Sequence, residues 1–158
     1  MRNLWSGGLA LVAGVVVLPV GVSVKQGYDV PKPDYRSDPR LVSLQKFFKR
    51  TACPAGKYAS AFVEAADRYD LDWRLLPSIS YVESTGGKLA PNNNLFGWNS
   101  GHAQFASPAA SIHEVGYRLS HSPLYRHKDT DGILATYNSN AEYAAKVKLV
   151  MRNIAAEQ

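Results

Sequence analysis

The chain has 158 residues, of which 46% are hydrophobic and 20% charged, so it can bury the core of one domain and is not wholly disordered. The formal net charge of +5 favours anionic partners such as nucleic acid, anionic lipid or cell wall. Because the basic residues lie singly or in small groups, the sequence gives no support to a nucleic-acid-binding arm.

The N-terminal segment has the pattern of an export signal. Residues 7–24 read GGLALVAGVVVLPVGVSV without a charge, Arg2 precedes them and Lys25 follows. A basic start followed by an apolar stretch predicts a signal peptide or a membrane anchor over residues 1–24. Both alternatives export the remainder of the chain, so we expect a location in the cell envelope, with membrane contact only through this segment.

A polar stretch with several prolines follows the apolar segment. This composition predicts an extended linker over residues 25–38 and a folded domain over residues 39–158. The sequence contains no oligomerisation signal, so we expect a monomer.

Within the domain, apolar residues recur at helical spacing in several stretches. Pro77 lies inside the third of these, where a helix beginning at Trp73 would lose a backbone hydrogen bond, so either the helix kinks or its regular part begins later. Ser107 followed by a proline is a typical helix start, and Asp72 is a candidate helix cap. The expected helices cover residues 39–49, 57–69, 73–84, 107–120, 132–137 and 141–154.

The middle of the domain reads as a long loop. Residues 86–106 are GGKLAPNNNLFGWNSGHAQFA, rich in glycine and asparagine but interrupted by large apolar side chains. Such a polar, flexible stretch predicts irregular structure, part of which can form a short hairpin. The expected fold is therefore mainly α, with an irregular central loop or a short hairpin.

Cysteine, histidine and acidic residues do not indicate a metal or cofactor. Cys53 is the lone cysteine and has no histidine close in sequence, which favours a buried thiol over a nucleophile. The histidines lack the spacing of zinc ligands. The run from Asp129 to Gly132 resembles only the start of a calcium loop and is better explained as a polar turn that caps the following helix. We expect no metal and no cofactor.

Glu83 is the candidate catalytic residue. It follows Leu76 and Ile79 on one face of the predicted third helix, close to that helix's C-terminus. Partial removal from water and the negative end of the helix dipole both raise a carboxyl pKa, which keeps the proton that a general acid needs. The loop that follows supplies aromatic and amide side chains, the mixture that sugar-binding sites use. An ordinary surface glutamate is the alternative.

Three motifs give the domain a resemblance to a known family. The run DLDWRLLPSISYVESTGGK resembles the catalytic helix of the lysozyme-like superfamily, which ends in Glu-Ser. Asn93-Asn94-Leu95-Phe96-Gly97-Trp98 resembles the Asn-Leu-Phe-Gly segment of bacterial glucosaminidase domains (endo-β-N-acetylglucosaminidase-like). Tyr137-Asn138, with Tyr143 beyond it, resembles a later part of that domain, and soluble lytic transglycosylases carry a similar Tyr-Asn pair.

The resemblance covers roughly residues 57–154 and implies a lysozyme-like α-rich fold, peptidoglycan as substrate and Glu83 as general acid. A tyrosine at position 137 is otherwise most simply a core residue. The resemblance implies that the substrate cleft is formed by Asn94, Phe96, Gly97, Trp98, Tyr137 and Asn138.

The chain departs from the family in one respect that bears on mechanism. The glucosaminidases usually carry a further acidic residue after the catalytic helix, whereas no Asp or Glu lies between Glu83 and Glu114. A hydrolase would then need a distant group to help water attack, with Glu114, Asp129 and Asp131 as candidates. In a lytic transglycosylase, Glu83 would instead serve as acid and then base, and the muramic acid C6 hydroxyl would attack.

The motifs slightly favour the hydrolase. A non-catalytic module that binds the wall remains the alternative from another class, because a fold can keep its cleft and lose its chemistry.

Overall fold

The structure is a computed structural model that describes residues 33–157. Within these residues, helices form where apolar residues recur at helical spacing. The predicted signal or anchor segment and residues 25–32 lie outside the described residues. No strand occurs within residues 33–157, so the mainly α prediction is confirmed and the central loop is irregular rather than a hairpin. The elements are α1 (Pro39–Arg50), η1 (Pro54–Tyr58), α2 (Ala59–Tyr69), α3 (Leu75–Ser84), η2 (Pro91–Asn93), α4 (Pro108–His121), α5 (Thr130–Tyr137) and α6 (Ala141–Ala155).

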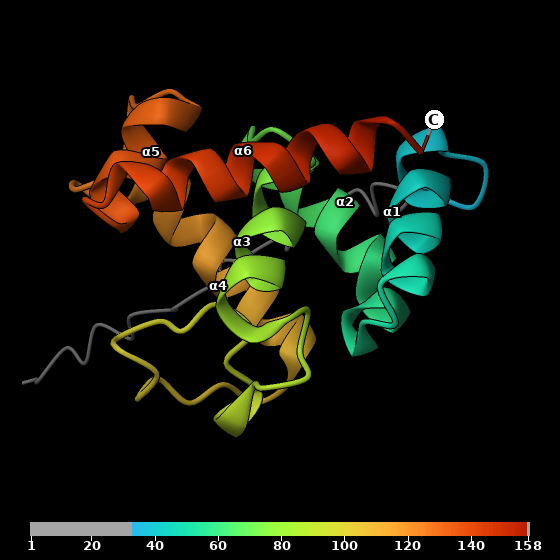
Figure 1. Ribbon diagram of the computed structural model, residues 1–158, viewed down its shortest axis with the longest axis horizontal. Helices are drawn as coiled ribbons and strands as arrows, with labels where there is room; N and C mark the ends of the chain where they lie inside the picture. Colours follow the sequence, from blue (N-terminus) through green and yellow to red (C-terminus); the bar gives the residue numbers. More distant parts are fainter. Residues whose placement is uncertain (1–32, 158) are drawn as a thin grey trace, which may run out of the picture. The chain divides into compact units, whose positions relative to one another are not determined.

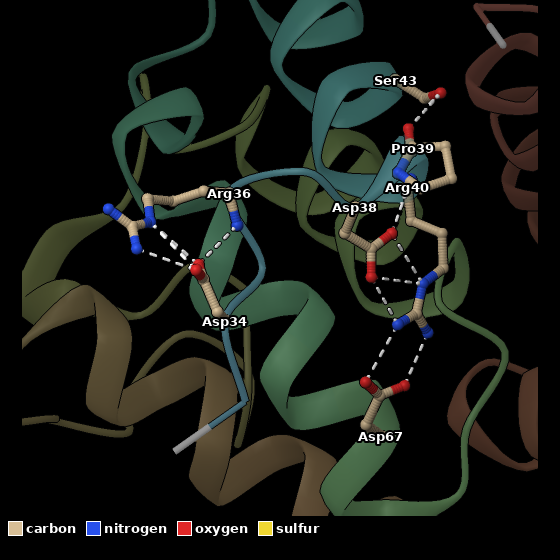
Figure 2. Close-up of polar contacts among 7 residues, drawn as sticks. All are labelled: Asp34, Arg36, Asp38, Pro39, Arg40, Ser43 and Asp67. Carbon is tan, nitrogen blue, oxygen red and sulfur yellow. Dashed lines mark hydrogen bonds and ion pairs between the residues drawn. The ribbon is translucent and has the colours of Figure 1, made fainter. Parts of the chain in front are cut away.

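The start of α1 is held by a network of charged side chains. Asp38 caps the helix by accepting a hydrogen bond from the backbone N–H of Arg40 at 2.8 Å. The Arg40 guanidinium bridges Asp38 and Asp67 of α2, with N···O distances of 2.7 and 2.6 Å (Figure 2). Tyr35 also packs against the core, so the last residues of the predicted linker belong to the compact unit, which begins at Pro33.

The position of Pro77 in α3 decides between the two alternatives for this helix. Regular α-helix begins at Leu75, so Pro77 lies in the first turn, where its missing N–H leaves no helical hydrogen bond unmade. The prediction of Asp72 as the helix cap is wrong, because the N-cap of α3 is Arg74, which has no side-chain capping bond. Asp72 instead accepts a hydrogen bond from the backbone N–H of Arg74 at 2.9 Å and so orders the turn before the helix. The later start is therefore correct, and no kink is needed.

Helices α2 and α4 pack closely because Gly116 has no side chain. A Cβ atom at Gly116 would lie 2.8 Å from Cδ2 of Tyr69 and 3.3 Å from Cδ1 of Leu76. Glycine inside a helix is unfavourable by propensity, and the close packing explains why it occupies this position in α4. The core beneath this contact consists of buried aromatic and aliphatic side chains, the largest of which include Phe47, Phe48, Phe62, Phe96, Leu76, Ile79 and Ile112.

Helix α3 carries the candidate acid and is placed between the core and the loop. It packs against α6, and the segment 86–106 leaves its C-terminal end (Figure 1). Thr85, Gly86 and Gly87 all have positive φ, which turns the chain away from the helix axis.

Cys53 is buried and unpaired, as predicted. Among the described residues, no helix combines the length and apolar character needed to cross a membrane.

Candidate active site at the end of α3

Ser84 fixes the loop against the end of α3. Its side chain is buried, and its hydroxyl oxygen lies 2.9 Å from the carbonyl oxygen of Ser80 and 2.8 Å from that of Leu95. The same oxygen accepts a hydrogen bond from the backbone N–H of Gly87 at 3.0 Å. The serine of the Glu-Ser pair therefore holds both the start and the middle of the loop on the helix.

Glu83, the preceding residue, lies against the same loop. A Cβ atom at Gly97 would be 2.8 Å from Oε2 of Glu83, and Gly97 has a φ of +58°. Only glycine combines that backbone conformation with room for a carboxylate at this distance. The Asn-Leu-Phe-Gly segment thus places its glycine directly at the candidate acid.

Burial raises the pKa of Glu83. As a whole residue Glu83 is exposed at the surface, but its carboxyl end lies at Gly97 and beside Tyr143, where water is partly excluded. Desolvation is the largest influence and raises the pKa, while the hydroxyl of Tyr143 lowers it. The net shift is upward, which favours the protonated form that a general acid requires.

Two tyrosines with parallel rings flank the carboxylate. The ring centroids of Tyr137 and Tyr143 are 5.9 Å apart with an interplanar angle of 3°. Burial, followed by the negative charge of Glu83, raises the pKa of both phenols, so both stay neutral. The Tyr137 hydroxyl donates a hydrogen bond to the carbonyl oxygen of Phe96. The Tyr143 hydroxyl is buried near Glu83 and lowers the pKa of that carboxyl group, although the two groups do not meet the geometric criteria of a standard hydrogen bond.

A cavity of about 520 Å³ adjoins this cluster. The indole of Trp98 forms part of its wall, with the Tyr137 ring 5.7 Å away in an edge-on arrangement and the Arg118 guanidinium 5.6 Å from the indole centroid. Flat aromatic faces next to polar groups suit a sugar ring. The residues that line the cavity are Gly97, Trp98, Asn99, Ser100, Ala103, Arg118, Tyr125 and Tyr137.

The structure places the residues implied by the resemblance in two groups. Gly97, Trp98 and Tyr137 line the cavity, and Glu83 adjoins it through Gly97. Asn94 and Phe96 are buried at 2% and 0% exposure and do not line it.

The three remaining side chains have structural partners. The Asn94 amide donates to the carbonyl oxygen of Trp98 at 3.0 Å and accepts from its backbone N–H at 2.9 Å, so it closes the turn that presents Trp98. Phe96 belongs to the hydrophobic core. Asn138 is exposed and accepts a hydrogen bond from the backbone N–H of Asn140 at 2.9 Å.

Tertiary packing adds residues that the motifs did not assign to the site. Tyr143 comes from the first turn of α6, Tyr125 from the loop after α4, and Arg118 from the last turn of α4. Tyr143 shares one face of α6 with buried residues such as Val147, so its spacing in the sequence does not distinguish it from a core residue. Arg118 is a charged residue that is not among the buried residues of α4, and nothing in the sequence distinguishes it from an ordinary surface arginine.

The other carboxylates proposed for the reaction have structural partners. Glu114 forms an ion pair with Arg118 at 2.7 Å, and Asp131 forms one with Lys148 at 2.7 Å. Asp129 caps α5 by accepting a hydrogen bond from the N–H of Gly132 at 2.8 Å, as the interpretation of this turn predicted. Within residues 33–157, no carboxylate contributes to the pKa shift of Glu83.

No protein-family model, no curated protein and no solved structure matches the chain significantly. In the part of the chain that the structure describes, no cluster of three or more His, Cys, Asp or Glu side chains could hold a metal ion.

Proposed function

We propose that this protein is a glycosidase that cleaves the glycan strands of peptidoglycan, with Glu83 as the general acid. The observation that carries the proposal is the Glu83 carboxylate against Gly97, where burial raises its pKa next to an aromatic-lined cavity. The Glu-Ser, Asn-Leu-Phe-Gly and Tyr-Asn motifs meet at this place and support peptidoglycan as the substrate class.

In this reaction Glu83 donates its proton to the glycosidic oxygen as the bond to the anomeric carbon breaks. Trp98 offers a flat apolar face to a sugar ring, and Tyr137 holds the backbone next to Gly97 through the carbonyl oxygen of Phe96. The two buried phenols stay neutral and add no competing charge near the acid.

The second half of the reaction separates two candidate enzymes. Hydrolysis by the usual routes needs a second carboxylate, either to activate water or to attack the sugar. Glu114, Asp129 and Asp131 are engaged with other partners. This observation favours the lytic transglycosylase, in which Glu83 takes the proton from the C6 hydroxyl of muramic acid as that oxygen forms the anhydro ring. The Asn-Leu-Phe-Gly segment favours the hydrolase.

Mass spectrometry of purified sacculi digested with the full-length protein tests the proposal. We expect new soluble fragments from the wild type and a loss of about 10²- to 10⁴-fold in their rate of release for Glu83→Gln, the range that general acid catalysis contributes. Glu64→Gln is the matched control, because Glu64 is a helix glutamate in an ion pair with Arg68, outside the cavity lining.

The fragment ends decide the chemistry. Reducing ends on N-acetylglucosamine indicate a glucosaminidase, and 1,6-anhydromuramic ends indicate a lytic transglycosylase. A folded wild-type protein that pellets with sacculi but releases nothing would support the wall-binding module instead. Equal activity of Glu83→Gln and wild type would refute Glu83 as the acid.

The location of this activity is part of the same proposal. The apolar residues 7–24, preceded by Arg2, support export to the cell envelope by a signal peptide or a membrane anchor. Peptidoglycan lies in that compartment, so the expected location and the expected substrate agree.

A further inference from the structure

Arg118 places a guanidinium, ion-paired with Glu114, at the wall of the cavity beside Glu83. Among the described residues that line this cavity, it is the one charged side chain, and no carboxylate lines it. The two lining phenols, Tyr125 and Tyr137, have raised pKa values and are neutral. A ligand in this cavity therefore meets aromatic faces and a guanidinium.

Two contacts fix the Arg118 side chain. Its guanidinium carbon lies 5.6 Å from the centroid of the Trp98 ring, and its Nε donates to Oε1 of Glu114 at 2.8 Å. Nη2 lies 2.7 Å from the same carboxylate oxygen. The contacts hold the guanidinium at the cavity wall at little cost in side-chain entropy, because the side chain is already ordered.

The guanidinium keeps donors for a ligand. An arginine has five N–H groups, and the Nη1 group of Arg118 makes no hydrogen bond to any described residue. Arg118 lines the cavity and its side chain is 47% exposed, so the guanidinium is not enclosed by the protein. Nη1 and the second N–H of Nη2 together form a planar fork that matches the two oxygens of a carboxylate.

We infer that Arg118 binds a carboxylate carried by the glycan and thereby selects peptidoglycan over a neutral polymer such as chitin. This inference deepens the proposed function and rests on it for the identity of the polymer. Chitin oligomers carry no carboxylate, whereas every muramic acid carries a lactyl group. The carboxylate has two possible sources: the lactyl group itself in peptide-free strands, or an amino acid of the stem peptide where the lactyl group is amidated.

Binding measurements in the Glu83→Gln background test this inference without turnover. Full-length Glu83→Gln and Glu83→Gln/Arg118→Gln are titrated with three ligands: a chitin oligomer, a peptide-free peptidoglycan strand and a strand that keeps its stem peptides. We expect Arg118→Gln to weaken binding of a carboxylate-bearing strand about tenfold, the lower end for a hydrogen bond to a charged group at a half-exposed site. Chitin binding should be unchanged.

Matched variants separate charge recognition from packing. Arg68→Gln removes the equivalent arginine of the Glu64–Arg68 ion pair on α2, with the same spacing as Glu114–Arg118 and outside the cavity lining, so it should change neither affinity. Arg118→Lys keeps the charge but not the fork and should recover part of the lost affinity. Salt should weaken binding of the charged strand by Glu83→Gln and should affect Glu83→Gln/Arg118→Gln less.

Each result decides the inference. A loss with the peptide-free strand assigns the lactyl carboxylate, and a loss only with the stem-bearing strand assigns the peptide. An equal loss of affinity for chitin would mean that Arg118 acts by supporting Trp98. No loss of affinity for any ligand would mean that Arg118 does not bind substrate. Either result would overturn the inference. A wild-type protein that shows the charge preference but cleaves nothing would refute the glycosidase while the inference stands.

Discussion

Gly116 and Gly97 make the same kind of contact in two regions of the molecule, with opposite consequences. In each case a Cβ atom would lie 2.8 Å from a side-chain atom of another element. At Gly116 the neighbour is the Tyr69 ring, and the close approach lets α2 and α4 pack. At Gly97 the neighbour is an ionisable carboxylate, and the backbone adopts a φ of +58° to admit it.

The first contact stabilises the fold, whereas the second carries a cost. Partial removal of the Glu83 carboxylate from water raises its pKa. The ionised form is therefore less favourable in the folded protein than in the unfolded chain, and this lowers the free energy of unfolding at neutral pH. The Tyr143 hydroxyl offsets part of this cost, because its interaction with the Glu83 carboxylate lowers the pKa of that group. Costs of this kind that bring no packing advantage are typical of functional sites. The comparison therefore separates the residues that build the fold from those proposed to act.

Gly97→Ala tests the contact at the proposed acid and has the largest expected effect. The added methyl group would displace the Glu83 carboxylate, and a misplacement of about 1 Å can reduce activity about a hundredfold. The rate of fragment release from sacculi measures the loss. Gly101→Ala is the control, because Gly101 has a φ of +84° but no atom within 4 Å of its Cβ position. Equal losses in the two variants would mean that backbone strain, not the carboxylate, is responsible.

Gly116→Ala tests the packing contact. Overpacking typically costs about 1–3 kcal/mol, and the better helix propensity of alanine returns up to about 1 kcal/mol. We expect a net loss of about 1–2 kcal/mol in the free energy of unfolding, measured by urea denaturation. Fragment release per folded molecule should stay within about twofold of the wild type (about 0.4 kcal/mol), because Gly116 and its neighbours Tyr69 and Leu76 lie outside the cavity lining. A large loss of activity without a loss of stability would contradict the separation of the two regions.

Tyr143→Phe has the smallest expected effect and acts on pH dependence. The hydroxyl of Tyr143 lowers the pKa of Glu83, so its removal should raise that pKa further. A general acid works in its protonated form, and activity falls as pH rises through its pKa. The alkaline limb of the kcat/KM profile should therefore move to higher pH in the variant. Tyr58→Phe, outside the cavity lining, should leave the limb in place, and a shift to lower pH in Tyr143→Phe would contradict the assignment.

Local signals predict most of the helices because they depend on neighbouring residues. Asp38 before Pro39, Ser107 before Pro108 and Asp129 before α5 all act as N-caps in the structure. Three helix starts differ from the prediction by two residues. Helix α2 begins at Ala59 after a short 3-10 helix, α5 begins at Thr130, and α3 begins at Leu75 instead of Trp73. Pro77 explains the difference in α3, since the later start places it in the first turn.

The roles of the loop residues could not be predicted from their order in the sequence. Asn94, Phe96 and Trp98 belong to one motif, yet only Trp98 lines the cavity, while Phe96 fills the core and Asn94 bonds to the backbone of Trp98. The motif indicated a site but not which of its side chains face the ligand. An irregular loop has no fixed repeat that would assign alternate residues to opposite sides.

By itself, the sequence determined the helical framework and the position of Glu83 at the end of α3, because caps, prolines and apolar spacing act over a few residues. Only the tertiary structure decided what surrounds that glutamate. Gly97, Tyr143 and Arg118 come from a loop and two later helices, and only folding brings them to one place. The raised pKa of Glu83 and the charge of the cavity depend on those distant neighbours, since desolvation and electrostatic interactions follow distance in space rather than along the chain.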